Sequence, residues 1–368
     1  MFYVNRYRSA MAERKSRAVR GATQNRESLR FNLPQTVVDG DWLDARDAID
    51  GAPPPLATTV TVEHPRTIIS RNASPDIGFD RSINPYRGCE HGCIYCFARP
   101  THAFHDLSPG LDFESRLFAK PDAPALLTAE LGRRGYEVRP MALGTNTDPY
   151  QPIERDWRIT RGILEVLREA HHPLTITTKS DRVTRDIDIL APMAAEGLAA
   201  VAISVTSLDP QTARTIEPRA PHPGRRLAAV RTLSDAGVST YVSIAPVIPA
   251  VTDHELEHLV ARAAEAGARA CFFIPVRLPH EVAPLFRAWL DTYYPDRADK
   301  VMATIRSLRG GRDNDPDFFT RMRGSGPWAE LMRTRFAIAC RRHGLANRGV
   351  PLRCDLFRPP AGPQGELF

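Results

Sequence analysis

The segment Gly88-Cys89-Glu90-His91-Gly92-Cys93-Ile94-Tyr95-Cys96 places three of the chain's six cysteines in one short stretch. Its C-x3-C-x2-C spacing favours a shared metal centre, because a disulfide across such short separations would be strained and would leave an odd thiol. Zinc normally takes four protein ligands, and His91 is placed to supply the fourth. An iron-sulfur cubane would instead use three thiolates and leave one iron open, which favours catalysis over a purely structural role.

Around this segment, short β-rich apolar stretches alternate with stretches of helical periodicity. This alternation predicts βα units and a parallel sheet. We expect strands near Ile83 and at 138–143, 174–178, 199–205, 240–245 and 270–275. We expect helices at 123–134, 158–171, 182–196, 224–236 and 254–266, several of them ended by a glycine. Six strands with right-handed crossovers predict an α/β fold, a partial (β/α)6 TIM-like barrel whose site lies at the C-terminal strand ends.

The charge and composition divide the chain into parts. Its net charge is +6, and residues 1–31, with eight basic and two acidic side chains, carry all of that excess. We expect a disordered basic tail and linker at 1–58, a core barrel at 59–276, a C-terminal helical extension at 277–357 and an extended tail at 358–368. Bulk charge is then no guide to what enters the barrel, although the tail would attract nucleic acid non-specifically.

The apolar stretches are also informative about location. None approaches the roughly 20 residues that a membrane-spanning helix needs, and no apolar segment of a secretory signal follows the basic start. A thiolate-ligated, oxygen-labile centre requires a reducing compartment. We therefore expect a cytoplasmic protein with no membrane partner.

The cysteine spacing, with the aromatic Tyr95 directly before the third cysteine, resembles the radical S-adenosylmethionine (SAM) superfamily. The resemblance implies a [4Fe-4S] cluster on Cys89, Cys93 and Cys96, whose open iron binds the amino and carboxylate groups of SAM. It also implies an enzyme in which reductive cleavage of SAM releases a 5′-deoxyadenosyl radical. The electron would come from a reductant such as flavodoxin or ferredoxin.

The flanking motifs narrow the resemblance. Asn84-Pro85-Tyr86-Arg87-Gly88 and the segments 97–102 and 147–152 look like those of radical SAM proteins grouped with spore photolyase, over roughly residues 65–357. This similarity implies nucleic acid repair or modification. Spore photolyase uses a cysteine donor between the cluster and the middle of the barrel, but no cysteine lies between Cys96 and Cys271 here. The same repair reaction is therefore doubtful, and the substrate stays open.

Polar residues that follow the second strand are candidates for the SAM amino group. Asn146 and Thr147 would accept hydrogen bonds from the ammonium, and Asp148 would add charge assistance. The alternative is an ordinary turn before the next helix, since these residue types favour turns and caps.

The third and fourth strands offer further candidates. Lys179 would pair with the SAM carboxylate or an acidic substrate, unless it is a solvated lysine at a helix start. Ser204 and Thr206 alternate on one strand face and would meet the ribose hydroxyls. Beyond them, Arg219 and the pair Arg225-Arg226 suit carboxylate or phosphate, unless they are plain surface arginines.

The last residues, Gln364-Gly365-Glu366-Leu367-Phe368, resemble peptides that bind bacterial sliding clamps. They support an alternative function of a different class. In it, the chain is a non-enzymatic iron-sulfur or zinc adaptor that acts on DNA through its basic arm and this peptide.

Overall fold

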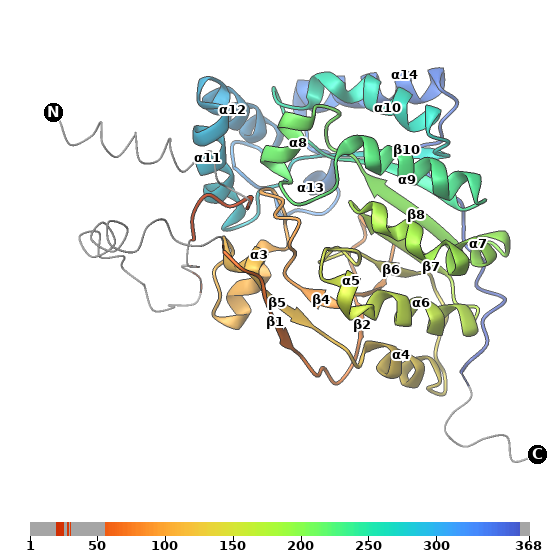
Figure 1. Ribbon diagram of the computed structural model, residues 1–368. Coiled ribbons are helices and arrows are strands. Elements are labelled where there is room, and N and C mark those ends of the chain that lie inside the picture. Colours follow the sequence, from red (N-terminus) through yellow and green to blue (C-terminus); the bar gives the residue numbers. More distant parts are fainter. Residues whose placement is uncertain (1–19, 26–27, 29, 31–55, 361–368) are drawn as a thin grey trace, which may run out of the picture.

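The computed structural model describes residues 20–25, 28, 30 and 56–360, and its centre is a curled seven-stranded sheet (Figure 1). The sheet order is β10-β9-β8-β7-β6-β3-β2. Its strands are β2 (Ile69–Arg71), β3 (Arg81–Ile83), β6 (Met141–Leu143), β7 (Leu174–Thr178), β8 (Ala199–Ser204), β9 (Ser239–Val247) and β10 (Ala270–Pro275). All neighbours from β3 to β10 pair in parallel, and β2 pairs antiparallel with β3. The six expected strands and the partial barrel are confirmed, and β2 is an addition.

Helices connect the parallel strands and lie along the outside of the sheet (Figure 1). They are α4 (Ala123–Leu131), α5 (Glu154–Trp157), α6 (Ile159–Glu169), η3 (Asp181–Asp186), α7 (Ile187–Ala195), α8 (Pro210–Ile216), α9 (Pro223–Asp235), η4 (Asp253–Glu255) and α10 (Leu256–Glu265). α6 shows why the periodicity was informative, since Ile159, Ile163 and Leu167 are buried at four-residue spacing. Gly197, Gly237 and Gly267 follow helices at φ of 75°, 81° and 87°, a left-handed conformation that glycine adopts without strain. The expected helix 182–196 is divided into η3 and α7.

A second, three-stranded sheet carries the cysteine segment. Its order is β1-β5-β4, with β1 (Thr59–Val62), β4 (Tyr86–Arg87) and β5 (Arg116–Ala119). The short elements η2 (Arg99–His105) and α3 (Asp112–Ser115) lie between β4 and β5. These elements are too short to produce a periodic pattern, which is why the sequence did not reveal them.

The C-terminal part consists of α11 (Val282–Tyr293), η5 (Pro295–Arg297), α12 (Ala298–Leu308), α13 (Thr320–Arg323) and α14 (Gly326–Arg342). α14 packs against the edge strand β10, where the rings of Phe273 and Phe336 lie 4.8 Å apart. The expected helical cover over the open sheet edge is therefore present, and it protects unpaired backbone groups of β10.

The segment after α14 returns beneath the barrel. Ala346 bridges Ala270 at the start of β10, and the Val350 N–H donates to the Tyr241 hydroxyl at 2.8 Å. Further along, the N–H of Arg353 donates to the carbonyl of Gly197 at 3.0 Å. The clamp-like peptide 364–368 lies outside the described residues and stays a prediction.

Part of the expected disordered tail is ordered. Residues 20–25 pack beside the cysteine segment, and the N–H groups of Gly21 and Ala22 each donate to the Glu114 carboxylate at 2.8 Å. The remainder of the expected tail, 1–19 and 31–55, lies outside the described residues. Within the described part of the chain, no helix has the length and apolar character to cross a membrane.

His172 is a buried, titratable residue at the base of the barrel. Its Nδ1 lies 2.9 Å from the Pro173 carbonyl and its Nε2 lies 2.9 Å from the Tyr136 hydroxyl, while the Phe357 ring packs 5.5 Å away. Burial lowers the pKa of His172 to about 4. The unfolded chain therefore binds a proton at this position between about pH 6.5 and about pH 4 that the folded chain does not.

We predict that the protein loses up to about 3 kcal/mol of stability from this group as the pH falls from about 6.5 to about 4. In His172→Phe, the urea midpoint of unfolding should change less over this pH range than it does in the wild type. The matched control is His64→Phe, because the His64 side chain is 69% exposed. Equal flattening in both variants would contradict the assignment.

Candidate metal and cofactor site

The three cysteines lie in a loop that follows β3 and β4, at the C-terminal end of the barrel strands. Cys89 and Cys93 are buried, Cys96 is half-buried, and all three are free. Gly88 and Gly92 permit the loop's path, at φ of 73° and 68°. A Cβ on Gly88 would lie 2.7 Å from the Phe113 carbonyl oxygen, so the loop excludes larger residues there. We call residues 88–96 the cluster loop.

A buried ion pair supports the cluster loop from behind. The Arg99 guanidinium contacts the Glu114 carboxylate at 2.6 Å, and both side chains are 0% exposed. Arg99 also donates to the carbonyls of Cys93 and Gly92, at 2.9 and 3.1 Å. The same carboxylate accepts hydrogen bonds from the N-terminal segment 20–25, which we call the strap. One buried pair therefore holds both the cluster loop and the strap in place. Sequence reasoning missed Arg99 and Glu114; the only signal was the position of Arg99 inside the motif at 97–102.

The thiols are chemically suited to a metal cluster. Burial raises the pKa of Cys93 to about 12 against the opposing effect of Lys179, and burial raises the pKa of Cys89 well above its ordinary value. Free thiols here hold their protons and lose them on metal binding, as thiolate ligands do. Among the described residues, no three side chains of ligand type converge as closely as one metal ion requires. A cubane attaches each thiolate to a different iron, so its ligands lie farther apart than the ligands of a single metal ion.

Polar side chains of the barrel interior lie next to the cluster loop. The Tyr95 hydroxyl donates to the Glu217 carboxylate, which also accepts from the Thr206 hydroxyl at 2.7 Å. Arg226 contacts the other Glu217 oxygen at 2.5 Å. Although burial alone would raise the pKa of Glu217, Arg226 and Lys179 lower it. Glu217 therefore stays an anion inside the barrel, a feature that the sequence did not single out.

Lys179 extends over this group from the end of β7. Its Nζ lies 5.7 Å from the centre of the Tyr95 ring. Burial alone would lower the pKa of Lys179, but Cys93, Glu217 and Asp148 outweigh it and raise the pKa. The structure thus brings Lys179, Tyr95 and Thr206 together beside the cysteines. Ser204 is buried on β8, and its hydroxyl makes no hydrogen bond within the described residues.

The residues after β6 divide into two roles. The Thr147 hydroxyl donates to the Gly88 carbonyl at 2.7 Å, and Asp148 accepts from the Thr178 hydroxyl and the Lys179 N–H, each at 2.7 Å. Both residues therefore join the cluster loop to the strand ends. The Asn146 side chain is exposed and makes no hydrogen bond in the described part of the chain, so of the three it is the most available to a ligand.

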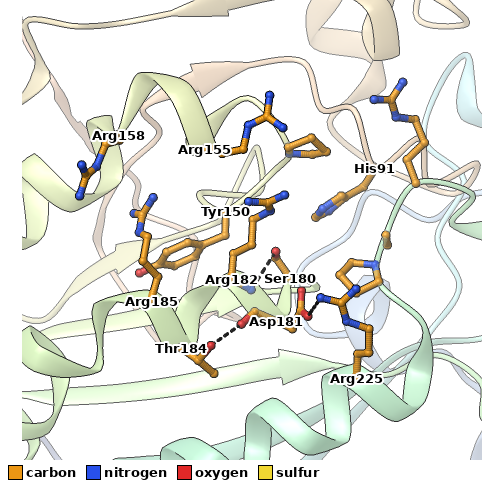
Figure 2. Close-up of a pocket in the computed structure, with 14 residues that line it drawn as sticks. His91, Tyr150, Arg155, Arg158, Ser180, Asp181, Arg182, Thr184, Arg185 and Arg225 are labelled. Atoms are coloured by element: carbon orange, nitrogen blue, oxygen red, sulfur yellow. Dashed lines mark hydrogen bonds and ion pairs between the residues drawn. The ribbon is translucent and has the colours of Figure 1, made fainter.

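His91 projects to the other side of the cluster loop. Its Nδ1 lies 3.3 Å from Asp148, and its ring lines a cavity that opens to solvent (Figure 2). Although burial alone would raise the pKa of Asp148, His91 and the hydrogen-bond donors around it lower the pKa to about 2. His91 thus lies within ion-pair distance of an anion, and among the described residues it belongs to no group of three ligand-type side chains that could hold a metal ion.

Comparisons with known proteins agree with this site. The family model described as "Radical SAM superfamily" matches residues 83–263, which include the cluster loop. The chain belongs to this superfamily. An uncharacterized protein of Mycobacterium tuberculosis is 37% identical over 79% of this chain and 82% of its own, and a protein of Mycobacterium bovis matches equally. A protein of Methanocaldococcus jannaschii is 27% identical over 58% of this chain and 76% of its own.

Solved structures show the same fold for this radical SAM chain. Spore photoproduct lyase complexed with dinucleoside spore photoproduct matches with a TM-score of 0.56 and 17% identity, covering 85% of this chain and 84% of that one. A mutant of that lyase with bound SAM and the same dinucleoside matches with a TM-score of 0.53 and 16% identity over 85% and 84%. At these identities the likeness concerns the fold.

We predict that Glu114→Ala destabilises the protein by about 3–5 kcal/mol, because it leaves the buried Arg99 guanidinium without its partner. Urea unfolding of the anaerobic protein measures the loss, and the iron content per chain should fall with it. Glu257→Ala is the matched control, since it breaks a surface pair with Arg335 and should cost only about 0–1 kcal/mol. Equal losses in both variants would show that the buried pair does not support the loop.

Proposed function

We propose that this chain is a radical SAM enzyme that holds a [4Fe-4S] cluster on Cys89, Cys93 and Cys96 and cleaves SAM reductively. One observation carries the proposal: three free cysteines lie in a single braced loop at the C-terminal strand ends, with the raised-pKa Lys179 beside them. When bound, such a cluster supplies one electron to SAM, and the cleavage yields methionine and a 5′-deoxyadenosyl radical.

The chain's own residues would bind and orient SAM. Lys179 would pair with the SAM carboxylate, because it keeps its charge in this site. The Asn146 side chain, which makes no hydrogen bond within the described residues, would accept from the ammonium. Ser204 and Thr206 would meet the ribose, while Glu217 holds the Thr206 and Tyr95 hydroxyls in place. The buried surroundings exclude water, which protects a radical from side reactions.

We predict that Cys93→Ala abolishes both the charge-transfer absorption of the cluster and the formation of 5′-deoxyadenosine from SAM and dithionite. Cys354→Ala is the matched control, because Cys354 is a free cysteine of the C-terminal segment outside the loop, and it should retain both. The measurement is anaerobic reconstitution followed by chromatography of the products. A fully loaded wild-type protein that forms no 5′-deoxyadenosine would reject the enzyme and favour the adaptor.

We further propose that the substrate is a nucleic acid. The support is the fold shared with spore photoproduct lyase, which was solved with a dinucleoside photoproduct. The hydrogen donor of this chain would differ, because Cys271 is fully buried in the core under α14 and no cysteine lies between it and Cys96. The reaction is therefore proposed as repair or modification, without a cysteine donor in that part of the barrel.

Deuterium transfer tests the substrate. Irradiated DNA, undamaged DNA and RNA, each deuterated at the sugar and base carbons, are incubated separately with the reduced enzyme and SAM. We expect deuterium in 5′-deoxyadenosine from one nucleic acid and none from a deuterated peptide mixture. Transfer from the peptides alone would overturn the nucleic acid assignment and leave the SAM cleavage intact.

A further inference from the structure

A cavity of about 680 Å³ lies on the side of the cluster loop where His91 projects (Figure 2). Segments that follow three neighbouring strands surround it: α5, η3 and the loop between α8 and α9. Six arginines line it, and we call the cavity the arginine basin: Arg155, Arg158, Arg182, Arg185, Arg219 and Arg225. Of these six arginines, the sequence had suggested Arg219 and Arg225 as anion binders; the other four lie in segments distant from them along the chain.

The charge of the basin is only partly compensated. Arg219 pairs with Glu90 at 2.9 Å, and Arg225 pairs with Asp181 at 2.6 Å. Arg155 and Arg185 also contact carboxylates. In contrast, the exposed Arg158 and Arg182 make no ion pair with any residue in the described part of the chain.

Arg158 is held in an unusual backbone conformation. Its φ is 51°, in the left-handed region where a side chain costs energy, at the junction of α5 and α6. The exposed side chain of Arg158 lines the basin.

The basin adjoins the cluster loop through His91. His91 lines the basin and belongs to the loop between its first two cysteines. The side chains that accompany the thiols inside the barrel, namely Lys179, Tyr95 and Glu217, do not line the basin. Hydrogen abstraction needs reacting atoms within about 3–3.5 Å, and none of the three cysteines of the cluster loop lines the basin. Electron transfer needs no such contact and can cross a loop of protein.

The lining also disfavours bound nucleotides. Proteins that hold single strands combine positive charge with aromatic rings on which bases stack. The aromatic rings that line the basin belong to Tyr150 and His91, which are 0% and 1% exposed, and the Tyr150 hydroxyl donates to Asp186 at 3.0 Å. The basin thus offers positive charge without a stacking platform.

We propose that the arginine basin is the docking site of an acidic one-electron carrier protein, a flavodoxin or a ferredoxin. The inference rests on the proposed function, and it names the protein that would reduce the cluster held by the cluster loop. In each encounter the carrier is oxidised by one electron and the cluster is reduced by one, and no bond or proton is transferred. The positive basin steers the acidic carrier to the loop, and the contact is of the small, transient kind found among electron-transfer proteins.

The test is the double charge reversal R158E/R182E, chosen because neither arginine has an ion-pair partner to lose. Binding of a purified oxidised flavodoxin and of a purified ferredoxin to the cluster-loaded protein is measured by interferometry at low ionic strength, without SAM. We expect affinity to fall about tenfold or more, and wild-type affinity to fall steeply with salt. The second-order rate of cluster reduction by the same carrier should fall by a similar factor.

The matched control is R341E/R342E, which changes the net charge equally on exposed residues of the last turn of α14. It should bind the carriers as the wild type does. The milder R158Q/R182Q should give an intermediate affinity, and the melting midpoints of all variants confirm that they are folded.

Several outcomes would overturn the docking site: unchanged affinity in R158E/R182E, an equal loss in the control, or binding of neither carrier by the wild type. Loss of binding to a 12-nucleotide single strand with carrier binding retained would also overturn it and assign the basin to nucleic acid. Because binding is measured without SAM, a failure of SAM cleavage would refute the proposed function separately.

Discussion

The buried pair between Arg99 and Glu114 is the interaction on which the rest of the site depends. A guanidinium and a carboxylate with no solvent exposure are stable only when their remaining hydrogen-bonding groups are satisfied. Here those groups are backbone carbonyls of the cluster loop on one side and backbone N–H groups of the strap 20–25 on the other. The pair therefore converts a glycine-containing loop, which alone would be mobile, into a fixed frame for three thiols.

The barrel adds a second fixed point. Asp148 follows β6, yet it accepts hydrogen bonds from the end of β7 and faces His91 of the cluster loop. Parallel strands end at one edge of the sheet, so a single carboxylate there can join two strand ends to a loop that comes from a third. One face of the loop then borders the polar barrel interior around Glu217. His91 of the same loop borders the arginine basin.

Much of the fold was predictable because each barrel strand and helix has a pattern of its own. β8 is a continuous apolar stretch because a parallel strand is buried on both faces, and α6 has a clear apolar stripe. The small sheet β1-β5-β4 was missed because its strands are short and partly exposed. The contacts of Gly21 and Ala22 could not be predicted for a related reason: these residues give no periodic apolar pattern, and their backbone N–H groups make the contacts.

The sequence by itself determined the family and predicted the metal ligands, since C-x3-C-x2-C keeps the three cysteines close together along the chain. It also determined the alternation of strands and helices, because the spacing of apolar residues predicts each of these elements. Only the tertiary structure decided which polar side chains meet. Thr147 and Asp148 bind the cluster loop and the strand ends through hydrogen bonds. Glu217 lies inside the barrel, and arginines from separate segments line one basin. Such convergence depends on crossovers that bring distant residues to one edge of a sheet, and no local pattern records it.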